Sequence, residues 1–238
     1  MKTTNYKARL LIFTWFTFAF LWSSSGANAN NINKYIVSNN TNKSTLTGSY
    51  QDVYNLYQEG NDFYNQKDYL KAISAYEEAL SINPNFDLAL NGKGWALREL
   101  KDYVSALDAF SQAIVINPGS YAHWQGRGNV LYYLGRFEES LSAYNTSLNI
   151  NFNSDNSQAG KAWALAKLNQ YGLALESFDR AIEMDSQIAN YWSGKGWVLY
   201  ELGRYQEASS TLERALELNP SDRFAQYYLG LIEKGFVG

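Results

Sequence analysis

The chain has 238 residues, of which 46% are hydrophobic and 18% charged, and its formal net charge is −3. This is the composition of a globular protein, and the charge gives no indication of a nucleic-acid partner. With no cysteine and a single histidine, His123, the sequence excludes disulfides, cysteine nucleophiles and zinc sites built from cysteine and histidine.

Residues 1–29 are predicted to be a signal peptide. Basic residues precede an apolar stretch over residues 10–22, and Ala27-Asn28-Ala29 supplies the small residues of a cleavage site. The apolar stretch is shorter than the ~20 residues that span a bilayer, so we expect cleavage after Ala29 and export to a periplasm, a lumen or the extracellular space. The alternative is that residues 10–22 stay in place as a membrane anchor.

Residues 30–52 follow the predicted signal peptide and are rich in asparagine, serine and threonine. They show no apolar period, and such a composition buries too little apolar area to offset the loss of chain entropy on folding. The sequence therefore predicts a flexible spacer over residues 30–52.

From residue 53 onward the sequence repeats itself every 34 residues. Glycine, aromatic and proline columns keep this period: Gly60, Gly94, Gly128, Gly196 and Gly230; Tyr69, Tyr103, Phe137, Tyr171 and Tyr205; Pro84, Pro118 and Pro220. Within a unit, apolar residues recur in steps of three and four, which predicts an apolar stripe on each of two helices. The fold class is therefore predicted to be all-α, built from helix-turn-helix repeats.

The joints between the predicted helices carry their own signals. Gly135 and Gly203 stand where the first helix of a unit should end, and glycine readily adopts the left-handed conformation found there. Asparagine-proline pairs stop the second helix, because proline cannot continue it. Ser140, Ser147 and Gln158 replace residues that are apolar in other units, so we expect a looser joint near residues 150–160.

The period and these columns resemble the tetratricopeptide repeat family. The resemblance implies a right-handed superhelical solenoid of about five repeats and a C-terminal capping helix. The repeats would run over residues 53–86, 87–120, 121–154, 155–188 and 189–222, with the cap at 223–238.

In this family the first helices line a concave groove. The resemblance places ten candidate partner-binding residues there: Tyr57, Asn61, Trp95, Arg98, Asn129, Tyr132, Tyr133, Trp163, Trp197 and Tyr200. It adds Gln125, Asn156, Asn190 and Phe224 along the same face. The tryptophans could simply pack between neighbouring helices, or they could present a ring face to an extended peptide.

The expected function is a non-catalytic, exported scaffold that binds an extended or helical segment of another protein. Two alternatives stay open: a solenoid that binds carbohydrate or another small ligand on its tryptophans, and an anchored structural subunit of an envelope complex. We expect no enzyme activity, no metal and no cofactor, since His123 has no nucleophile elbow or phosphate loop nearby.

A chaperone C-terminal tail is not the expected partner. Family members that clamp such a tail use lysine, arginine and asparagine at fixed groove positions. Gly92, Ala122 and Gly126 stand at three of these positions here. The residues that would bind the acidic tail are therefore missing.

Four basic residues also follow the 34-residue period, at position 7 of successive repeats: Lys93, Arg127, Lys161 and Lys195. They could form a ladder for an acidic partner. We expect instead a solvated flank on which acids such as Glu99, Asp102 and Glu201 offset them.

Overall fold

The computed structural model describes residues 43–235, with side chains from Tyr50 onward. The predicted signal peptide and residues 30–42 of the predicted spacer lie outside the described residues. The chain divides into two units, residues 1–47 and 48–238, and the second holds the described helices apart from the first residues of α2.

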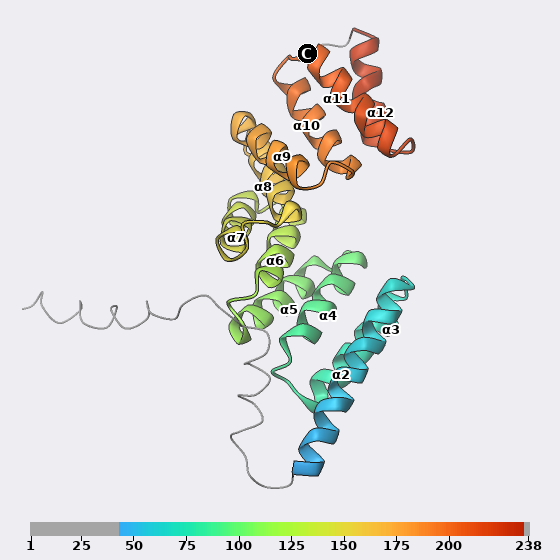
Figure 1. Ribbon diagram of the computed structural model, residues 1–238, viewed down its shortest axis with the longest axis vertical. Coiled ribbons are helices and arrows are strands. Elements are labelled where there is room, and N and C mark those ends of the chain that lie inside the picture. The colour runs from blue at the N-terminus through green and yellow to red at the C-terminus, as the bar shows by residue number, and fades with distance from the viewer. Residues whose placement is uncertain (1–42, 236–238) are drawn as a thin grey trace, which may run out of the picture. The chain divides into compact units, whose positions relative to one another are not determined.

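Over residues 43–235 the structure consists of α-helices without strands (Figure 1). Their bounds are α2 (Lys43–Asn65), α3 (Tyr69–Ile82), α4 (Asp87–Glu99), α5 (Tyr103–Ile116), α6 (Tyr121–Tyr133), α7 (Phe137–Ile150), α8 (Asp155–Lys167), α9 (Tyr171–Met184), α10 (Ala189–Glu201), α11 (Tyr205–Leu218) and α12 (Arg223–Glu233). Each helix from α3 onward packs against the next one, and α4, α6, α8, α10 and α12 also pack against one another in that order. The predicted all-α repeat fold is confirmed.

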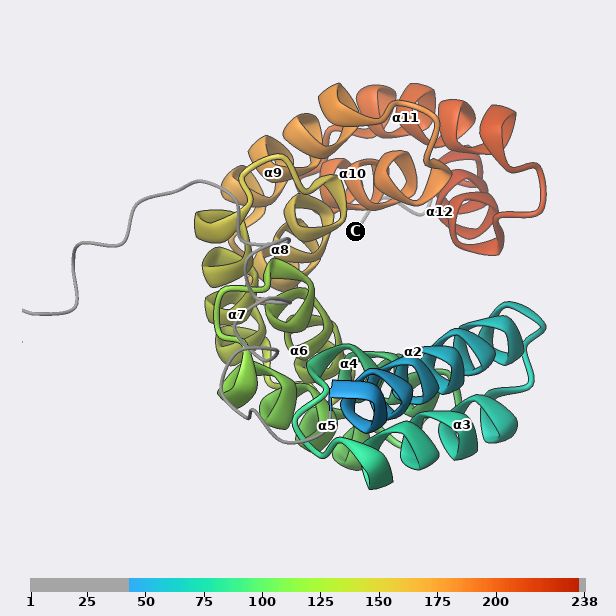
Figure 2. The same ribbon diagram turned by 60° about the horizontal axis from the view of Figure 1, so that its bottom comes forward.

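The helices of the second unit form two layers along a curved path. Figure 2 shows α4, α6, α8 and α10 on the inner side of the curve and α5, α7, α9 and α11 on the outer side. The second helices α3, α5, α7, α9 and α11 all begin at the aromatic column that follows the 34-residue period. The first helices therefore share one face, as side chains at matching positions of a stacked array must.

Helix α2 begins earlier than the sequence suggested. It starts at Lys43, so residues 43–52 are helical although they belong to the predicted flexible spacer. Among the side chains described from Tyr50 onward, Tyr50 is 46% exposed and Val53 is the first that is fully buried. Extending a helix that already exists adds one backbone hydrogen bond for each residue that becomes ordered, so α2 can continue beyond the first repeat.

The turn inside each repeat has a residue in the left-handed region. Gly135 and Gly203 have φ of 74° and 71°, in agreement with the sequence expectation, whereas Lys67, Lys101 and Asn169 hold φ of 63°, 64° and 59° at the matching turns. A side chain with a Cβ is strained in this region by roughly 1–2 kcal/mol. Three of the described turns therefore keep a conformation that glycine would adopt more easily.

Replacing Lys101 by glycine is expected to raise the free energy of unfolding by about 1 kcal/mol, since relief of this strain outweighs the larger entropy that glycine loses on folding. Urea unfolding followed by circular dichroism would measure the change. The reciprocal variant, Gly135→Lys, should lose a similar amount. A destabilised Lys101→Gly protein would contradict this account of the turn.

The aromatic ring at position 24 of a repeat fills space between two first helices. The Phe110 ring is fully buried, and a Cβ added to Gly94 of α4 or to Gly126 of α6 would lie 2.9 or 2.2 Å from its atoms. The fifth repeat has Leu212 instead of a ring, and Tyr228 of α12 packs against its cluster at the position where earlier repeats have glycine. Ring and glycine therefore form matched pairs across the joints.

Buried hydroxyl groups hold α7 against α6 on one side and α8 on the other. Ser140 Oγ donates to Gly128 O at 2.7 Å, and Ser147 Oγ donates to Tyr121 O at 3.0 Å. Ser147 Oγ also lies 2.9 Å from Ser157 Oγ, which accepts from Ser154 Oγ at the same distance. Hydrogen bonds thus hold the serines where the sequence suggested a looser joint.

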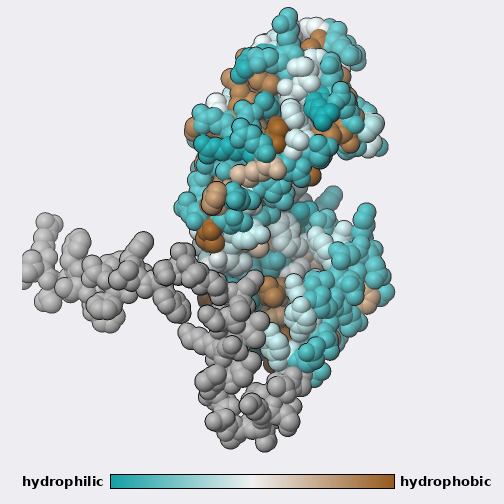
Figure 3. All heavy atoms as spheres, in the orientation of Figure 1, coloured by the Kyte–Doolittle hydropathy of each residue, from teal (hydrophilic) through white to brown (hydrophobic). Residues whose placement is uncertain are grey.

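Hydrophobic residues occur in small separate groups among hydrophilic ones on the face of the molecule shown in Figure 3. Among residues 43–235, no helix has both the length and the apolar character needed to cross a bilayer.

A candidate partner-binding cavity on the first helices

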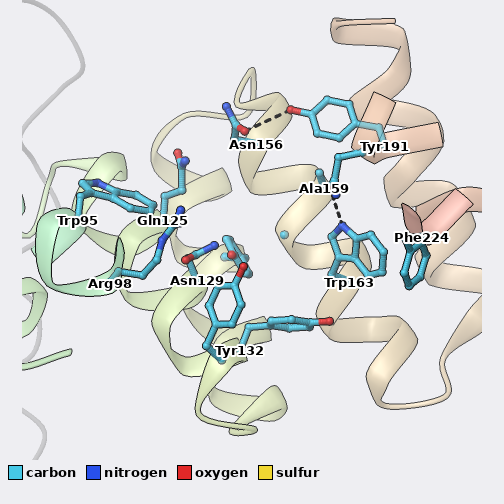
Figure 4. Close-up of a pocket in the computed structure, with 14 residues that line it drawn as sticks. Trp95, Arg98, Gln125, Asn129, Tyr132, Asn156, Ala159, Trp163, Tyr191 and Phe224 are labelled. Atoms are coloured by element: carbon cyan, nitrogen blue, oxygen red, sulfur yellow. Dashed lines mark hydrogen bonds between the residues drawn. The ribbon is translucent and has the colours of Figure 1, made fainter. Parts of the chain in front are cut away.

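A cavity of about 390 Å³ opens among α4, α6, α8, α10 and α12 (Figure 4). It is lined by aromatic rings, amide side chains, a single cation and no carboxylate: Trp95, Arg98, Gln125, Asn129, Tyr132, Tyr133, Tyr144, Asn156, Ala159, Gly160, Trp163, Asn190, Tyr191 and Phe224. Most of them occupy positions 2, 5, 9, 12 and 13 of their repeats. Residues three and four apart lie on one face of a helix, so the repeat itself brings them together.

Arg98 is the one cation of the lining. Its guanidinium carbon lies 5.1 Å from the ring centroid of Trp95 and 6.0 Å from that of Tyr133. Nη1 bonds Glu99 Oε1 at 2.7 Å, while the buried Nε has no hydrogen-bond partner among the described residues. The guanidinium group is thus held against two rings, with its charge partly offset by Glu99.

Two asparagines of the lining are fixed through their side-chain oxygens. Trp163 Nε1 donates to Asn190 Oδ1 at 3.2 Å, and Tyr191 OH donates to Asn156 Oδ1 at 3.3 Å, as Figure 4 shows. Within residues 50–235, the NH2 group of neither asparagine bonds the protein. The buried Oδ1 of Asn129 has no partner there either. The cavity therefore offers both donors and acceptors to a ligand.

Three buried tyrosines of the lining, Tyr132, Tyr144 and Tyr191, keep their protons. Burial raises the pKa of Tyr132 to about 12, and the neighbouring Tyr133 contributes to the shift. Burial likewise raises the pKa of Tyr144 and of Tyr191. These hydroxyl groups are neutral hydrogen-bond donors at physiological pH, so Arg98 carries the only charge of the lining.

Six of the ten predicted groove residues line this cavity: Trp95, Arg98, Asn129, Tyr132, Tyr133 and Trp163. So do Gln125, Asn156, Asn190 and Phe224, which the resemblance placed on the same face. The structure thus brings together groove positions from four first helices and the terminal helix α12.

Four predicted groove residues lie outside the cavity. Tyr57 packs edge-on against Phe86 with ring centroids 5.5 Å apart, and Asn61 Oδ1 accepts from Tyr76 OH at 2.8 Å. Trp197 is only 7% exposed and stacks on Trp163 at 5.6 Å. Tyr200 contacts the rings of Tyr205 and Tyr228. The three tryptophans therefore differ in their surroundings: Trp197 is buried between helices, whereas Trp95 and Trp163 line the cavity.

Sequence reasoning missed Tyr144, Tyr191 and Ala159. Tyr144 comes from the second helix α7 and reaches the cavity beside Gly160, where an added Cβ would lie 2.2 Å from its ring. A tyrosine at position 24, followed by glycine at position 6 of the next repeat, was the available signal. Tyr191 donates to Asp155 at 2.8 Å, a carboxylate one repeat earlier.

The basic residues at position 7 are partnered differently from the expectation. Lys93 pairs with Glu77 at 2.7 Å and Lys195 with Asp179 at 2.6 Å, each acid lying on the preceding second helix. The expected acids have other partners: Glu99 binds Arg98, Asp102 caps α5, and Glu201 accepts from Trp197. The expectation that Glu99, Asp102 and Glu201 offset the charges of these basic residues was wrong. The acids that pair with Lys93 and Lys195 come from the preceding repeat, which the sequence expectation did not consider.

The sequence matches a family model described as tetratricopeptide repeat over residues 57–121, 160–223 and 195–233. Together these ranges cover more than half of the chain. A search of the curated proteins gives no match.

Solved structures with the same fold include several repeat proteins. The TPR protein YrrB, whose structure is described as having an unusual peptide-binding site, is 19% identical, with 77% of this chain and 94% of that chain covered and a TM-score of 0.59. A thermophilic TPR protein of Thermus thermophilus is also 19% identical, and the alignment covers 76% of this chain and 99% of that chain with a TM-score of 0.65. Pseudomonas aeruginosa pilF is 14% identical, and the alignment covers 79% of this chain and 86% of that chain with a TM-score of 0.70.

At these identities the similar structures support the fold alone. The family match agrees with the 34-residue period and with the consecutive helix pairs of the structure. The chain belongs to the tetratricopeptide repeat family.

Proposed function

We propose that this chain is a non-catalytic scaffold that binds an extended segment of another protein in the cavity among α4, α6, α8 and α10. Proteins of this family generally act as interaction scaffolds and bind other proteins or peptides. The described peptide-binding site of YrrB is in keeping with this use of the fold. The observation that carries the proposal is the lining, which combines aromatic rings with amides and a single charge.

Each class of lining residue suits one part of a peptide. The rings of Trp95 and Trp163 offer apolar contact area to side chains, and aromatic residues are enriched at binding hot spots. Gln125, Asn129 and Asn156 can bond the N–H and C=O groups that every peptide unit carries. A lining without carboxylates suits a segment that is neutral or acidic.

Export completes the proposal. The basic start, apolar stretch and Ala27-Asn28-Ala29 of the N-terminus support cleavage after Ala29. N-terminal sequencing of the mature protein would test this. If residues 1–29 are still present, the membrane anchor is favoured instead.

Peptides selected from a random display library against residues 30–238 should depend on the cavity. Trp95→Ala and Asn129→Ala are each expected to weaken a selected peptide about tenfold, since hot-spot residues contribute more than 1 kcal/mol when truncated. Fluorescence anisotropy with labelled peptide would measure the affinity, and circular dichroism would show that each variant is folded.

Trp124→Ala is the matched control. Trp124 Nε1 donates to Pro118 O at 2.9 Å, and Trp124 does not line the cavity. Its loss should leave the affinity within about twofold of wild type. Peptides that bind all three variants equally would refute the site. Quenching of tryptophan fluorescence by soluble glycans, with no peptide selected, would favour the carbohydrate alternative.

A further inference from the structure

Two joints of the array carry the same ion pair between repeats. A lysine at position 7 of a first helix meets an acid at position 25 of the preceding second helix: Lys93 with Glu77, and Lys195 with Asp179. Both lysines are 26% exposed, and the distances are 2.7 and 2.6 Å. The geometry of the stack therefore places these two positions in contact wherever the repeat is regular.

The two joints between them keep the cation and lack the acid. Arg127 of α6 and Lys161 of α8 occupy position 7, but position 25 of the preceding helix holds Ser111 and Asn145. Arg127 lies over the Trp124 ring, 5.6 Å from its centroid. Lys161 has neither a ring contact nor an ion pair in the part of the chain that the structure describes.

A second cation and a hollow accompany Lys161. A cavity of about 210 Å³ on α7, α8 and α9 is lined by Lys161, Arg180 and Asn145 among others, with Leu141 and Leu173 as apolar neighbours. We call it the flank cavity. It shares no lining residue with the cavity on the first helices.

The charges of the flank cavity do not cancel. Glu176 is its one acid, and it forms no ion pair within 4 Å of Lys161 or Arg180 among residues 50–235. Burial lowers the pKa of Lys161, Arg180 lowers it further, and Glu176 partly opposes both. A cation that is desolvated beside a like charge favours any anion that comes close to it.

We propose that the flank cavity binds a carboxylate side chain of an acidic peptide. This carboxylate lies between Lys161 and Arg180 and replaces the acid that regular joints have at position 25, where this joint has Asn145. The cavity is smaller than the 300–1,000 Å³ typical of small-molecule sites, and suits one or two side chains. Leu141 and the 51% exposed Leu173 offer contact to an apolar neighbour of that acid. This surface does not depend on the function proposed for the first-helix cavity.

Fluorescein-labelled Gly-Leu-Glu-Leu-Glu-Gly and its counterpart with glutamine for glutamate are suitable probes. The glutamate peptide should bind the mature chain at least fivefold more tightly, and the difference should shrink in high salt. Asn145→Glu supplies the acid that the regular joints possess, and it should weaken binding at least fivefold. The double variant Lys161→Gln with Arg180→Gln should do the same.

Ser111→Glu is the matched control, because it adds the same acid at the neighbouring joint, outside the flank cavity. It should bind the glutamate peptide like wild type, as should Trp95→Ala. Equal binding of the two peptides would overturn the proposal. So would binding that survives Asn145→Glu in a variant of normal helicity, or binding that Trp95→Ala abolishes, since the peptide would then lie in the first-helix cavity.

Discussion

Replacing Phe110 by alanine is expected to lower the free energy of unfolding by about 3–5 kcal/mol, the usual cost of removing a buried aromatic ring. The side chain is fully buried between α4 and α6, and its ring lies against the backbones of Gly94 and Gly126. Neither glycine has a side chain that could fill the space. Urea unfolding followed by circular dichroism at 222 nm would measure the loss.

Val104→Ala is the control for this variant, because Val104 lies on the same helix and is 71% exposed. It should cost less than about 0.5 kcal/mol. A partner variant tests the fit itself: Gly126→Ala should destabilise the protein, and adding Phe110→Leu should recover part of the loss. A loss below about 1 kcal/mol for Phe110→Ala would contradict the packing described here.

Replacing Asp87 by alanine is expected to lower the free energy of unfolding by about 2–3 kcal/mol at pH 7, because two donors lose their acceptor and each unsatisfied donor costs about 1–3 kcal/mol when it is buried. Asp87 Oδ2 accepts from Asn117 Nδ2 at 2.8 Å and from His123 Nε2 at 3.0 Å. His123 is only 1% exposed, so water cannot replace the carboxylate. The three residues join the second and third repeats.

The effect should depend on pH. Burial alone would raise the pKa of Asp87, but hydrogen bonds from His123 and Asn117 outweigh it and leave the pKa below its ordinary value. A lowered pKa contributes stability that is complete above the ordinary value of about 3.9 and is lost as the pH falls through the folded-state value. The difference in free energy of unfolding between wild type and Asp87→Ala should therefore be largest at pH 7 and shrink below about pH 4.

Asp108→Ala removes an exposed carboxylate of α5 and serves as the control. Its stability should follow that of wild type within about 0.5 kcal/mol across this pH range. A gap for Asp87→Ala that is as wide at pH 3 as at pH 7 would show that the carboxylate charge contributes nothing to this joint.

The helices could be predicted from the sequence because their signals are local. Steps of three and four between apolar residues mark the helical faces, and Gly135 and Gly203 mark turns whose conformation glycine favours. Lys101 adopts the same left-handed conformation without being a glycine, so only the 34-residue period predicts a turn there. Helix α2 begins at Lys43, ahead of the apolar pattern that starts at Val53, so the pattern did not mark its start.

The site could be predicted only in part because its details depend on neighbouring repeats. Trp95, Trp163 and Trp197 occupy one position, yet Trp197 is buried against Trp163 with Phe224 of α12 close by. No pattern within a single repeat distinguishes them. Glu77 and Asp179 were missed for the same reason, since they approach the lysines from the preceding second helix.

The rings that lie beside glycines on two successive helices have a consequence for how the array opens. A ring such as Phe110 belongs to two repeats at once, so one repeat cannot come apart without exposing the packing of its neighbour. The stretch from α3 to α10 should accordingly respond as one cooperative block. At the far end Leu212 replaces the ring, and α12 is joined to the block through its own rings, Phe224 on Trp163 and Tyr228 on Tyr200. Phe224 lines that end of the cavity, so a displacement of α12 would change the lining there while Trp95 and Arg98 at the other end stay in place.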